Sequence, residues 1–319
     1  MNLPVVRGNE NAYESNSRWQ RCHSARSKNC VIKNYLLPAF GDLCLRDLTP
    51  LGLQRYFSEM AGIKLAHESK DKIRDVLSSI LGSAVKYGYL VKNPAEGLKL
   101  PPRKMGKRVK PFITPQQFMA LVDLISEPYA TMVFVAVLTG LRVSELIGLR
   151  WRNVYSDSIT IEERCCRGDW GAPKSEASNA TIAVNQMVIA RLHRLKTVIV
   201  KLRAGHAIRR YPAVKSSKPD DLVFQSVIRG RPMRDNNILS RFIKPAARIL
   251  GIPWVNWRCL RTSHATWLKL AGADVKDAQA QMRHSRASTT LDIYQQFIPE
   301  SQRRAIDKLG KLTEPTTVQ

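Results

Sequence analysis

Apolar side chains recur in the N-terminal third of the chain at the spacing of an amphipathic helix. Between residues 70 and 86 they fall at three- and four-residue steps on one face, and the charged side chains lie largely off it. The apolar positions are Ile73, Val76, Leu77, Ile80, Leu81 and Ala84. Thr49 followed by Pro50 predicts the start of an earlier helix, because a threonine oxygen caps a helix and proline suits its first position. We therefore expect a small helical domain at residues 16–99, after a loose polar segment at residues 1–15.

A basic, proline-containing segment at residues 100–111 is expected to link this domain to a second one. Its basic side chains are Arg103, Lys104, Lys107, Arg108 and Lys110. Such a run is either a solvated linker or a strand of chain that lies along DNA phosphates, and the pattern alone leaves both open.

The second domain is expected to span residues 112–312, with a tail at residues 313–319. Thr114 and Gln117 fit a capping box at the start of a helix, and Thr139-Gly140 interrupts the next one. Further helices are expected to follow towards residue 312.

Short β-like stretches at residues 159–161 and 180–184 predict a small sheet inserted among these helices. A helix is then expected from about residue 185 to 203, and the basic stretch 208–220 is expected to be a loop. The predicted fold class is mainly α with a small β-sheet (α+β).

Charge narrows the class of partner. The 319 residues include 51 Lys and Arg against 26 Asp and Glu, a formal net charge of +25, and the pI is near 10.2. A polyanion is the expected partner. No apolar run approaches the ~18 residues of a membrane span, and the start of the sequence does not resemble a signal peptide, so we expect a cytoplasmic protein without a membrane partner.

The six cysteines lack metal-ligand spacing, and no cluster of Asp and Glu resembles a two-metal site, so no metal or cofactor is expected. The cysteines are expected to be free thiols.

Several basic residues stand at positions suited to binding an anion. Arg142 follows a glycine turn at an expected helix start, with Glu145 three residues on and on the same face. Arg258 and Arg261 share a helical face and could form a fork for a tetrahedral phosphate. Taken singly, each pattern is more often a surface ion pair or an exposed basic helix.

Three more residues carry chemistry. Lys174 lies between the two β-like stretches, where it is expected to lie in a hairpin turn. His284 and Tyr294 follow ten residues apart near the end of the domain. A lone histidine is usually structural and a lone tyrosine usually belongs to a core edge.

In order and spacing, the set resembles the tyrosine recombinase (phage integrase) family over nearly the whole chain. That family has an Arg in a Thr-Gly-Leu-Arg-x-x-Glu-Leu segment, matched here by Arg142 and Glu145. It has a Lys on a β-hairpin turn, matched by Lys174 with Ser178 four residues on, and a His-x-x-Arg helix, matched at its Arg by Arg261.

The pattern continues with a Gly-His segment, matched by His284, and a Thr-Thr-x-x-x-Tyr segment, matched by Tyr294. The N-terminal helices, with Leu37-Pro38-Ala39-Phe40-Gly41 and Asn93-Pro94-Ala95, look like the family's core-binding domain. The resemblance implies two domains that clamp duplex DNA.

Two positions depart from the family pattern. Arg258 stands where the family has His, and Arg283 stands where it has Gly. A guanidinium can donate to a phosphate oxygen but cannot accept a proton near neutral pH, which argues against a general base at residue 258. His264, three residues beyond Arg261, occupies a position that the family fills with packing residues and is expected to be structural.

The resemblance implies that Tyr294 is the nucleophile and forms a 3′-phosphotyrosine bond. Arg142, Arg261, Arg258 and His284 are expected to hold the phosphate, with Glu145 orienting Arg142 and Lys174 protonating the 5′ leaving group. Integration or excision of a mobile element is the expected role.

Double-stranded DNA is the expected partner, with a homotetramer on two DNA sites and accessory DNA-bending proteins. The apolar stripe Ala305, Ile306, Leu309 and Leu312 is expected either to dock into a neighbouring protomer or to pack on its own chain. The alternatives to a recombinase are a non-catalytic DNA-binding protein and a type IB topoisomerase-like nicking-closing enzyme.

Overall fold

The computed structural model describes residues 23–102, 110–173, 179–204, 206–294, 303, 306 and 307, with the main chain alone at residues 23–26, 204 and 292–294. The expected N-terminal segment, the C-terminal tail and most of the expected C-terminal stripe lie outside these residues, as do Arg103, Lys104, Lys107 and Arg108 of the linker. Within the described part, no helix is long and apolar enough to cross a membrane.

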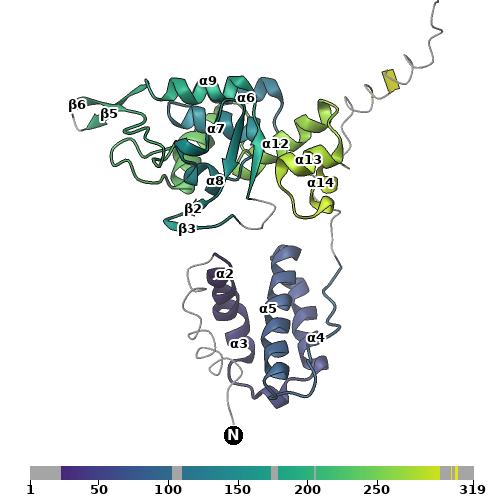
Figure 1. Cartoon of the computed structure of the whole chain (residues 1–319). Coiled ribbons are helices and arrows are strands. Elements are labelled where there is room, and N and C mark those ends of the chain that lie inside the picture. The colour runs from purple at the N-terminus through teal and green to yellow at the C-terminus, as the bar shows by residue number, and fades with distance from the viewer. Residues whose placement is uncertain are drawn as a thin grey trace, which may run out of the picture. The chain divides into compact units, whose positions relative to one another are not determined.

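The chain divides into two compact units, residues 1–108 and 109–319 (Figure 1). Unit 1 is helical in its described part, which agrees with the sequence pattern. Its elements are α2 (His23–Val31), the π-helix η2 (Ile32–Leu36), α3 (Leu37–Phe40), the 3-10 turn η3 (Leu45–Asp47), α4 (Pro50–Glu59), the 3-10 turn η4 (Met60–Gly62) and α5 (His67–Lys86).

Both helix predictions for unit 1 are confirmed. The Thr49 side chain accepts a hydrogen bond from the Gly52 main-chain N–H at 3.1 Å and caps α4. Five of the six apolar positions on the predicted face of α5 are buried, and Ile80 packs against the same cluster. Phe57 is fully buried in this core, which gives unit 1 a hydrophobic centre of its own.

In its described residues, unit 2 contains the remaining helices and three small two-stranded sheets. Its helices are α6 (Pro115–Leu124), α7 (Tyr129–Thr139), α8 (Val143–Gly148), α9 (Gln186–Leu195), α10 (Asp235–Ile238), α11 (Lys244–Ile249), α12 (Trp257–Leu270), α13 (Val275–Met282) and α14 (Ala287–Tyr294), with the short turns η5 (Trp151–Asn153) and η7 (Leu239–Ile243). The strands are β1 (Ser158–Ile161), β2 (Arg164–Cys166), β3 (Asp169–Gly171), β4 (Ala180–Ala183), β5 (Ile199–Ala204) and β6 (Ala207–Pro212). The predicted fold class, mainly α with small sheets, is confirmed.

Helix α7 is the centre of unit 2. Its apolar run, residues 132–138, is almost entirely buried and is surrounded by the other helices (Figure 1). The helix ends at Gly140, whose φ of +65° lies in the left-handed region that glycine adopts without strain. This turn brings the next residues back towards α12, which packs against α7.

The predicted strands and capping box are present. β1 pairs antiparallel with β4, with Ile159 opposite Ile182, and both side chains are buried. Thr114 and Gln117 form the reciprocal capping box at the start of α6. The β2–β3 hairpin lies between β1 and β4 in the chain.

The prediction for residues 185–220 is wrong in part. Helix α9 ends at Leu195 instead of near residue 203, and the expected loop contains β6, which pairs with β5 as an antiparallel hairpin. The run Thr197-Val198-Ile199-Val200 is β-branched, and branched side chains favour strands. The partner strand β6, with Ile208 and Tyr211, pairs with this run. This pairing is not evident when the run is interpreted as the end of a helix.

Candidate active site

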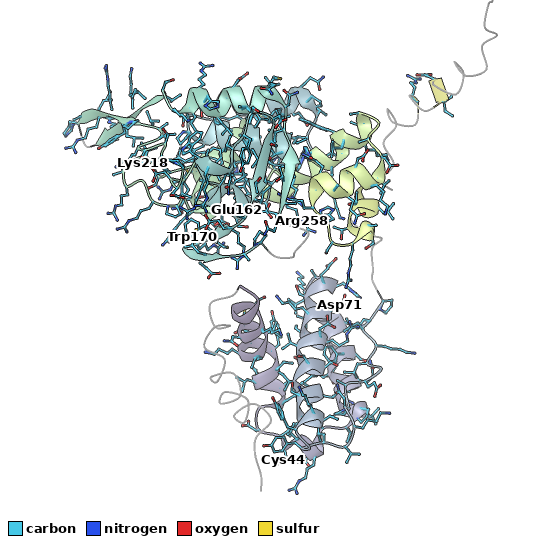
Figure 2. The ribbon with its side chains drawn as sticks, viewed as in Figure 1. Cys44, Asp71, Glu162, Trp170, Lys218 and Arg258 are labelled. Atoms are coloured by element: carbon cyan, nitrogen blue, oxygen red, sulfur yellow. The ribbon has the colours of Figure 1, made fainter. Side chains whose placement is uncertain are left out.

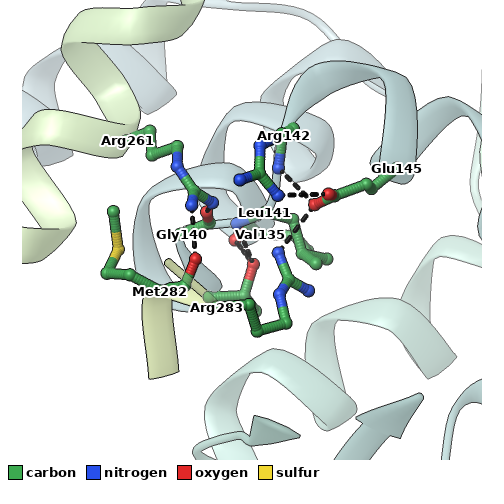
Figure 3. A network of polar contacts seen from close by, with 9 residues as sticks. Val135, Gly140, Leu141, Arg142, Glu145, Arg261, Met282 and Arg283 are labelled. Atoms are coloured by element: carbon green, nitrogen blue, oxygen red, sulfur yellow. Dashed lines mark hydrogen bonds and ion pairs between the residues drawn. The ribbon is translucent and has the colours of Figure 1, made fainter. Parts of the chain in front are cut away.

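Three segments of unit 2 bring predicted site residues together. Arg142 lies at the start of α8, Arg261 in the second turn of α12, and His284 just after α13. The turns after α7 and α13 meet at Arg261, which binds both of them (Figure 3). A cluster of charged side chains forms at this junction.

Arg142 and Glu145 are joined within one helical turn. The Arg142 main-chain N–H donates to Glu145 Oε2 at 2.8 Å, and Arg142 Nη1 donates to Oε1 at 2.8 Å. The Glu145 side chain is 2% exposed and that of Arg142 is 29% exposed. Glu145 thus holds Arg142 from the buried side and leaves part of the guanidinium accessible.

Arg261 ties the two turns together through main-chain carbonyls. Nη1 donates to the Gly140 oxygen and Nη2 donates to the Met282 oxygen. Burial, together with the charges of Arg142 and Arg283, lowers the pKa of Arg261 to about 9, although the Glu145 carboxylate partly opposes this shift. Arg261 therefore remains a cation at neutral pH.

His284 is neutral at pH 7. Burial lowers the pKa of its imidazole to about 4, and the nearby charges of Arg261 and Arg142 contribute. His284 Nδ1 lies 2.9 Å from Thr290 Oγ1 on α14, and the Gln279 amide donates to the His284 carbonyl at 3.0 Å. A neutral imidazole fixed in this way can donate one hydrogen bond to an anion but carries no charge itself.

From the sequence alone, Arg283 is only a departure from the family pattern. In the structure its side chain is 1% exposed, and Nη2 donates to Glu145 Oε2 at 2.7 Å. Its main chain adopts the left-handed conformation, φ 50° and ψ 50°, at the end of α13. The sequence signal for this conformation is the glycine of the family pattern at this position, because glycine is typical of a left-handed turn.

His264 lies behind the cluster. Its Nδ1 is 2.8 Å from the Val137 carbonyl, and its ring packs against Gly140. Burial lowers the pKa of His264 to about 4, so this ring is also neutral. These contacts agree with the structural role expected from the sequence.

Arg258 is one turn before Arg261 on α12 and is exposed at the surface of unit 2 (Figure 2). No hydrogen bond or ion pair joins its side chain to another residue in the described part of the chain. Lys110 is half-buried and lies close enough to lower the pKa of His284. Lys174 and Ser178 lie outside the described residues, and only the main chain of Tyr294 is described, as the last residue of α14.

The described cluster is suited to a tetrahedral anion. The cluster has a formal charge of +2, from the three arginines Arg142, Arg261 and Arg283 and the one carboxylate of Glu145. It is largely buried, so its charge is weakly screened. Helix α14 reaches the same place, since Thr290 contacts His284 four residues before Tyr294. Across the described ranges, no three His, Cys, Asp or Glu side chains are grouped as a metal site.

Comparison with known sequences gives a consistent result. Residues 111–300 match the family model described as the phage integrase family. The ICEBs1 integrase of Bacillus subtilis is 25% identical over 298 residues, covering 90% of this chain and 77% of that protein. A XerC-like tyrosine recombinase of Caldanaerobacter subterraneus is 24% identical, covering 82% of this chain and 70% of that protein.

Solved structures share the fold. The Tn1549 transposon integrase bound to transposon right end DNA matches with a TM-score of 0.70 at 17% identity, covering 97% of this chain and 100% of that one. A lambda integrase tetramer bound to a Holliday junction matches with a TM-score of 0.67 at 16% identity, covering 93% of this chain and 80% of that one.

Proposed function

The chain belongs to the phage integrase family, and from that membership we propose that it is a site-specific recombinase that cuts and rejoins duplex DNA through a 3′-phosphotyrosine bond at Tyr294. One observation carries the proposal. Arg142, Arg261 and a neutral His284 converge from three separate segments on one place, which α14 also reaches with Thr290. A scissile phosphate bound there would face two guanidiniums and an imidazole donor.

In the proposed reaction the Tyr294 phenol gives its proton to solvent water, and its oxygen attacks the scissile phosphorus. The bond from phosphorus to the 5′ oxygen breaks, and Lys174 supplies the proton for that oxygen. One phosphate ester replaces another, so the reverse attack by a 5′ hydroxyl reseals the strand without ATP. Arg142 and Arg261 stabilise the negative charge on the non-bridging oxygens, and His284 donates a hydrogen bond.

Arg258 is assigned a supporting role. Its place in the first turn of α12, on the same face as Arg261, lets a guanidinium donate to a phosphate oxygen without acting as a base. The proposed mechanism therefore takes no proton through residue 258.

Duplex DNA is the proposed substrate, and the charge of the β5–β6 hairpin supports it. Residues 185–219 contain no Asp or Glu, and Lys201 stands directly opposite Arg210 across the hairpin, both exposed. Like charges placed opposite each other destabilise a hairpin, and a phosphate backbone would relieve that repulsion. The hairpin lies at the far end of unit 2 from α12, α13 and α14 (Figure 1), so its contacts would be separate from the chemistry.

A tetramer on two DNA sites is the proposed assembly. It is supported by the lambda integrase structures, which hold a dimer on a COC′ core site and a tetramer on a Holliday junction. The DNA is proposed to be the joined ends of a mobile element, with integration or excision as the outcome.

The test is a covalent adduct assay. Purified protein is incubated with supercoiled plasmid that carries the ends of the element encoding it, and adducts are separated on a denaturing gel. We expect an adduct with the parent and none with Tyr294→Phe. No adduct on cognate DNA would refute the proposed function.

Two further variants test the assigned roles. Arg261→Ala is expected to slow single-turnover cleavage by about 10²–10³-fold, as loss of a donor to a developing charge does. Lys174→Ala should be rescued by a 5′-bridging phosphorothioate, whose leaving group needs no proton. Cleavage by Arg261→Ala at the parent rate, or no rescue of Lys174→Ala, would contradict the respective role.

A non-catalytic DNA-binding protein is the second candidate, and Arg258 is the observation that favours it. Arg258 replaces the histidine of the family pattern, is exposed, and has no hydrogen bond or ion pair with another described residue. Tight binding to cognate DNA without an adduct would support this candidate. Relaxation of the plasmid without recombinant product would instead support a type IB topoisomerase-like activity.

A further inference from the structure

Arg283 is held in a conformation that does not suit an arginine. It ends α13 with φ 50° and ψ 50°, and its N–H donates to the Ala280 carbonyl at 2.9 Å. For a residue with a side chain this left-handed conformation is unfavourable, whereas glycine adopts it freely. The main chain alone would therefore favour glycine at this position.

The side chain of Arg283 does not compensate by making many hydrogen bonds. It is 1% exposed, its one hydrogen bond is to Glu145, and Nε and Nη1 have no partner among the described residues. Removing a guanidinium from water is unfavourable unless its donors are satisfied. Both the left-handed backbone and the unsatisfied donors of Arg283 are therefore unfavourable for the stability of the fold.

What Arg283 does contact is the carboxylate that holds Arg142. Glu145 Oε2 accepts from Arg283 Nη2 at 2.7 Å and from the Arg142 main-chain N–H at 2.8 Å, while Oε1 accepts from Arg142 Nη1. The two arginines approach the carboxylate from different sides (Figure 3). Three donors from two segments leave Glu145 little freedom to turn.

Arg283 also changes the charge that Arg142 presents. Arg142 and Glu145 alone form a neutral pair, whereas Arg142, Glu145 and Arg283 together carry a formal charge of +1. Because both guanidiniums share one carboxylate, Arg142 is less neutralised towards an incoming anion in this buried setting.

We propose that Arg283 is a positioning residue for strand cleavage, which fixes Glu145 and thereby sets the orientation and effective charge of Arg142. The inference rests on the proposed function, because the reaction affected is cleavage at Tyr294. Arg283 itself does not touch the phosphate, and its effect reaches the reaction through Glu145.

The test compares three substitutions of Arg283 in the full-length protein. Arg283→Met removes the charge and the hydrogen bond but keeps an unbranched apolar stem, Arg283→Gly introduces the residue that suits the backbone, and Arg283→Lys keeps the charge. Single-turnover cleavage is measured on a nicked suicide substrate at saturating protein, DNA affinity by fluorescence anisotropy, and folding by circular dichroism.

We expect Arg283→Met and Arg283→Gly to cleave about 10- to 100-fold more slowly at saturation, the size of effect that a misplaced catalytic group produces. DNA affinity should change much less, because the rest of the interface is intact. Arg283→Lys should recover most of the rate, since the single contact to Glu145 needs only one donor. Parent-level cleavage by Arg283→Gly, or a loss confined to affinity, would overturn the proposal.

Arg191→Met is the matched control. Arg191 also binds a carboxylate, Glu127, at 3.1 Å, but it does so at the opposite end of α7 from Gly140. This variant should lose stability and still cleave at the parent rate once folded. Equal slowing by Arg191→Met and Arg283→Met would mean that the effect at residue 283 is merely structural.

A double variant tests whether Arg283 acts through Glu145. If Arg283 works by fixing Glu145, the double variant Glu145→Gln/Arg283→Met should cleave about as fast as Glu145→Gln alone. Losses that multiply would exclude Glu145 as the intermediary. An adduct with the parent and equal rates in all variants would refute this inference alone, whereas no adduct with the parent would refute the proposed function and this inference with it.

Discussion

The turn at Gly140 permits a sharp prediction about how the site is supported. A Cβ added to Gly140 would lie 2.5 Å from His264 Cδ2 and 2.9 Å from Met282 Sδ. The φ of +65° is also unfavourable for any residue that has a Cβ. Gly140→Ala therefore combines two separate penalties, one from the backbone and one from steric overlap.

The chain contains a control that separates these penalties. Gly251 has a φ of +69°, but nothing lies within 4 Å of a Cβ added there. Gly251→Ala should lose only the backbone contribution, on the order of 1 kcal/mol of unfolding free energy. Gly140→Ala should lose about 1–3 kcal/mol more, because His264 is anchored to the Val137 carbonyl and cannot move aside easily.

Thermal unfolding followed by circular dichroism measures the difference. For a unit of this size each kcal/mol corresponds to roughly 2–4 °C, so Gly140→Ala should melt about 2–12 °C below Gly251→Ala. Its cleavage should also slow, because the Gly140 carbonyl that moves is an acceptor for Arg261. Equal melting temperatures for the two variants would refute the argument that overlap with His264 constrains this turn.

Three further outcomes follow from the structure. The pKa of His264 is about 4 in the folded protein and near 6.5 in the unfolded chain, so the stability that depends on its neutral form is complete above pH ~6.5 and is lost as the pH falls towards 4. His264→Gln should therefore show a smaller drop in melting temperature between pH 7 and pH 5 than the parent, and equal drops would contradict this. Neutralising Lys201 and Arg210 together as Lys201→Gln/Arg210→Gln should reduce the slope of log affinity for DNA against log salt by about two if both contact phosphates, and an unchanged slope would remove the hairpin from the interface. Arg258→His should give cleavage a dependence on ionisation near pH ~6.5 that the parent lacks, and identical pH profiles would mean that residue 258 does not act in the reaction.

Helices α4, α5 and α6 could be predicted from the sequence because each has a local signal. The apolar face of α5 repeats at helical spacing, and Thr49 and Thr114 each place a capping oxygen before a proline. These features depend on neighbours within a few residues. They could therefore be identified without any knowledge of the tertiary structure.

The β5–β6 hairpin was missed because its stability depends on pairing between residues farther apart. Val198 lies three residues after Leu195, the last residue of the amphipathic helix α9, so the helical spacing of apolar residues continues past the end of the helix. Only the partner strand shows that Val200 pairs with Tyr211. Basic residues on both strands also obscure the alternation that marks a half-buried strand. The charge of the segment was evident in the sequence, but its conformation was not.

In the candidate active site, too, the residues could be selected from the sequence but their contacts could not. Gly140 and Arg261 could be selected from the order of the motifs, yet the hydrogen bond between the Arg261 side chain and the Gly140 carbonyl spans 121 residues of sequence. Arg283 could be recognised as unusual, because a left-handed turn favours glycine there, but its contact with Glu145 crosses 138 residues. The sequence thus shows that Arg283 departs from the family pattern, but only the fold shows that Glu145 is its partner. Because that partner also holds Arg142, the substitution at residue 283 alters the environment of a predicted catalytic group instead of merely filling a turn.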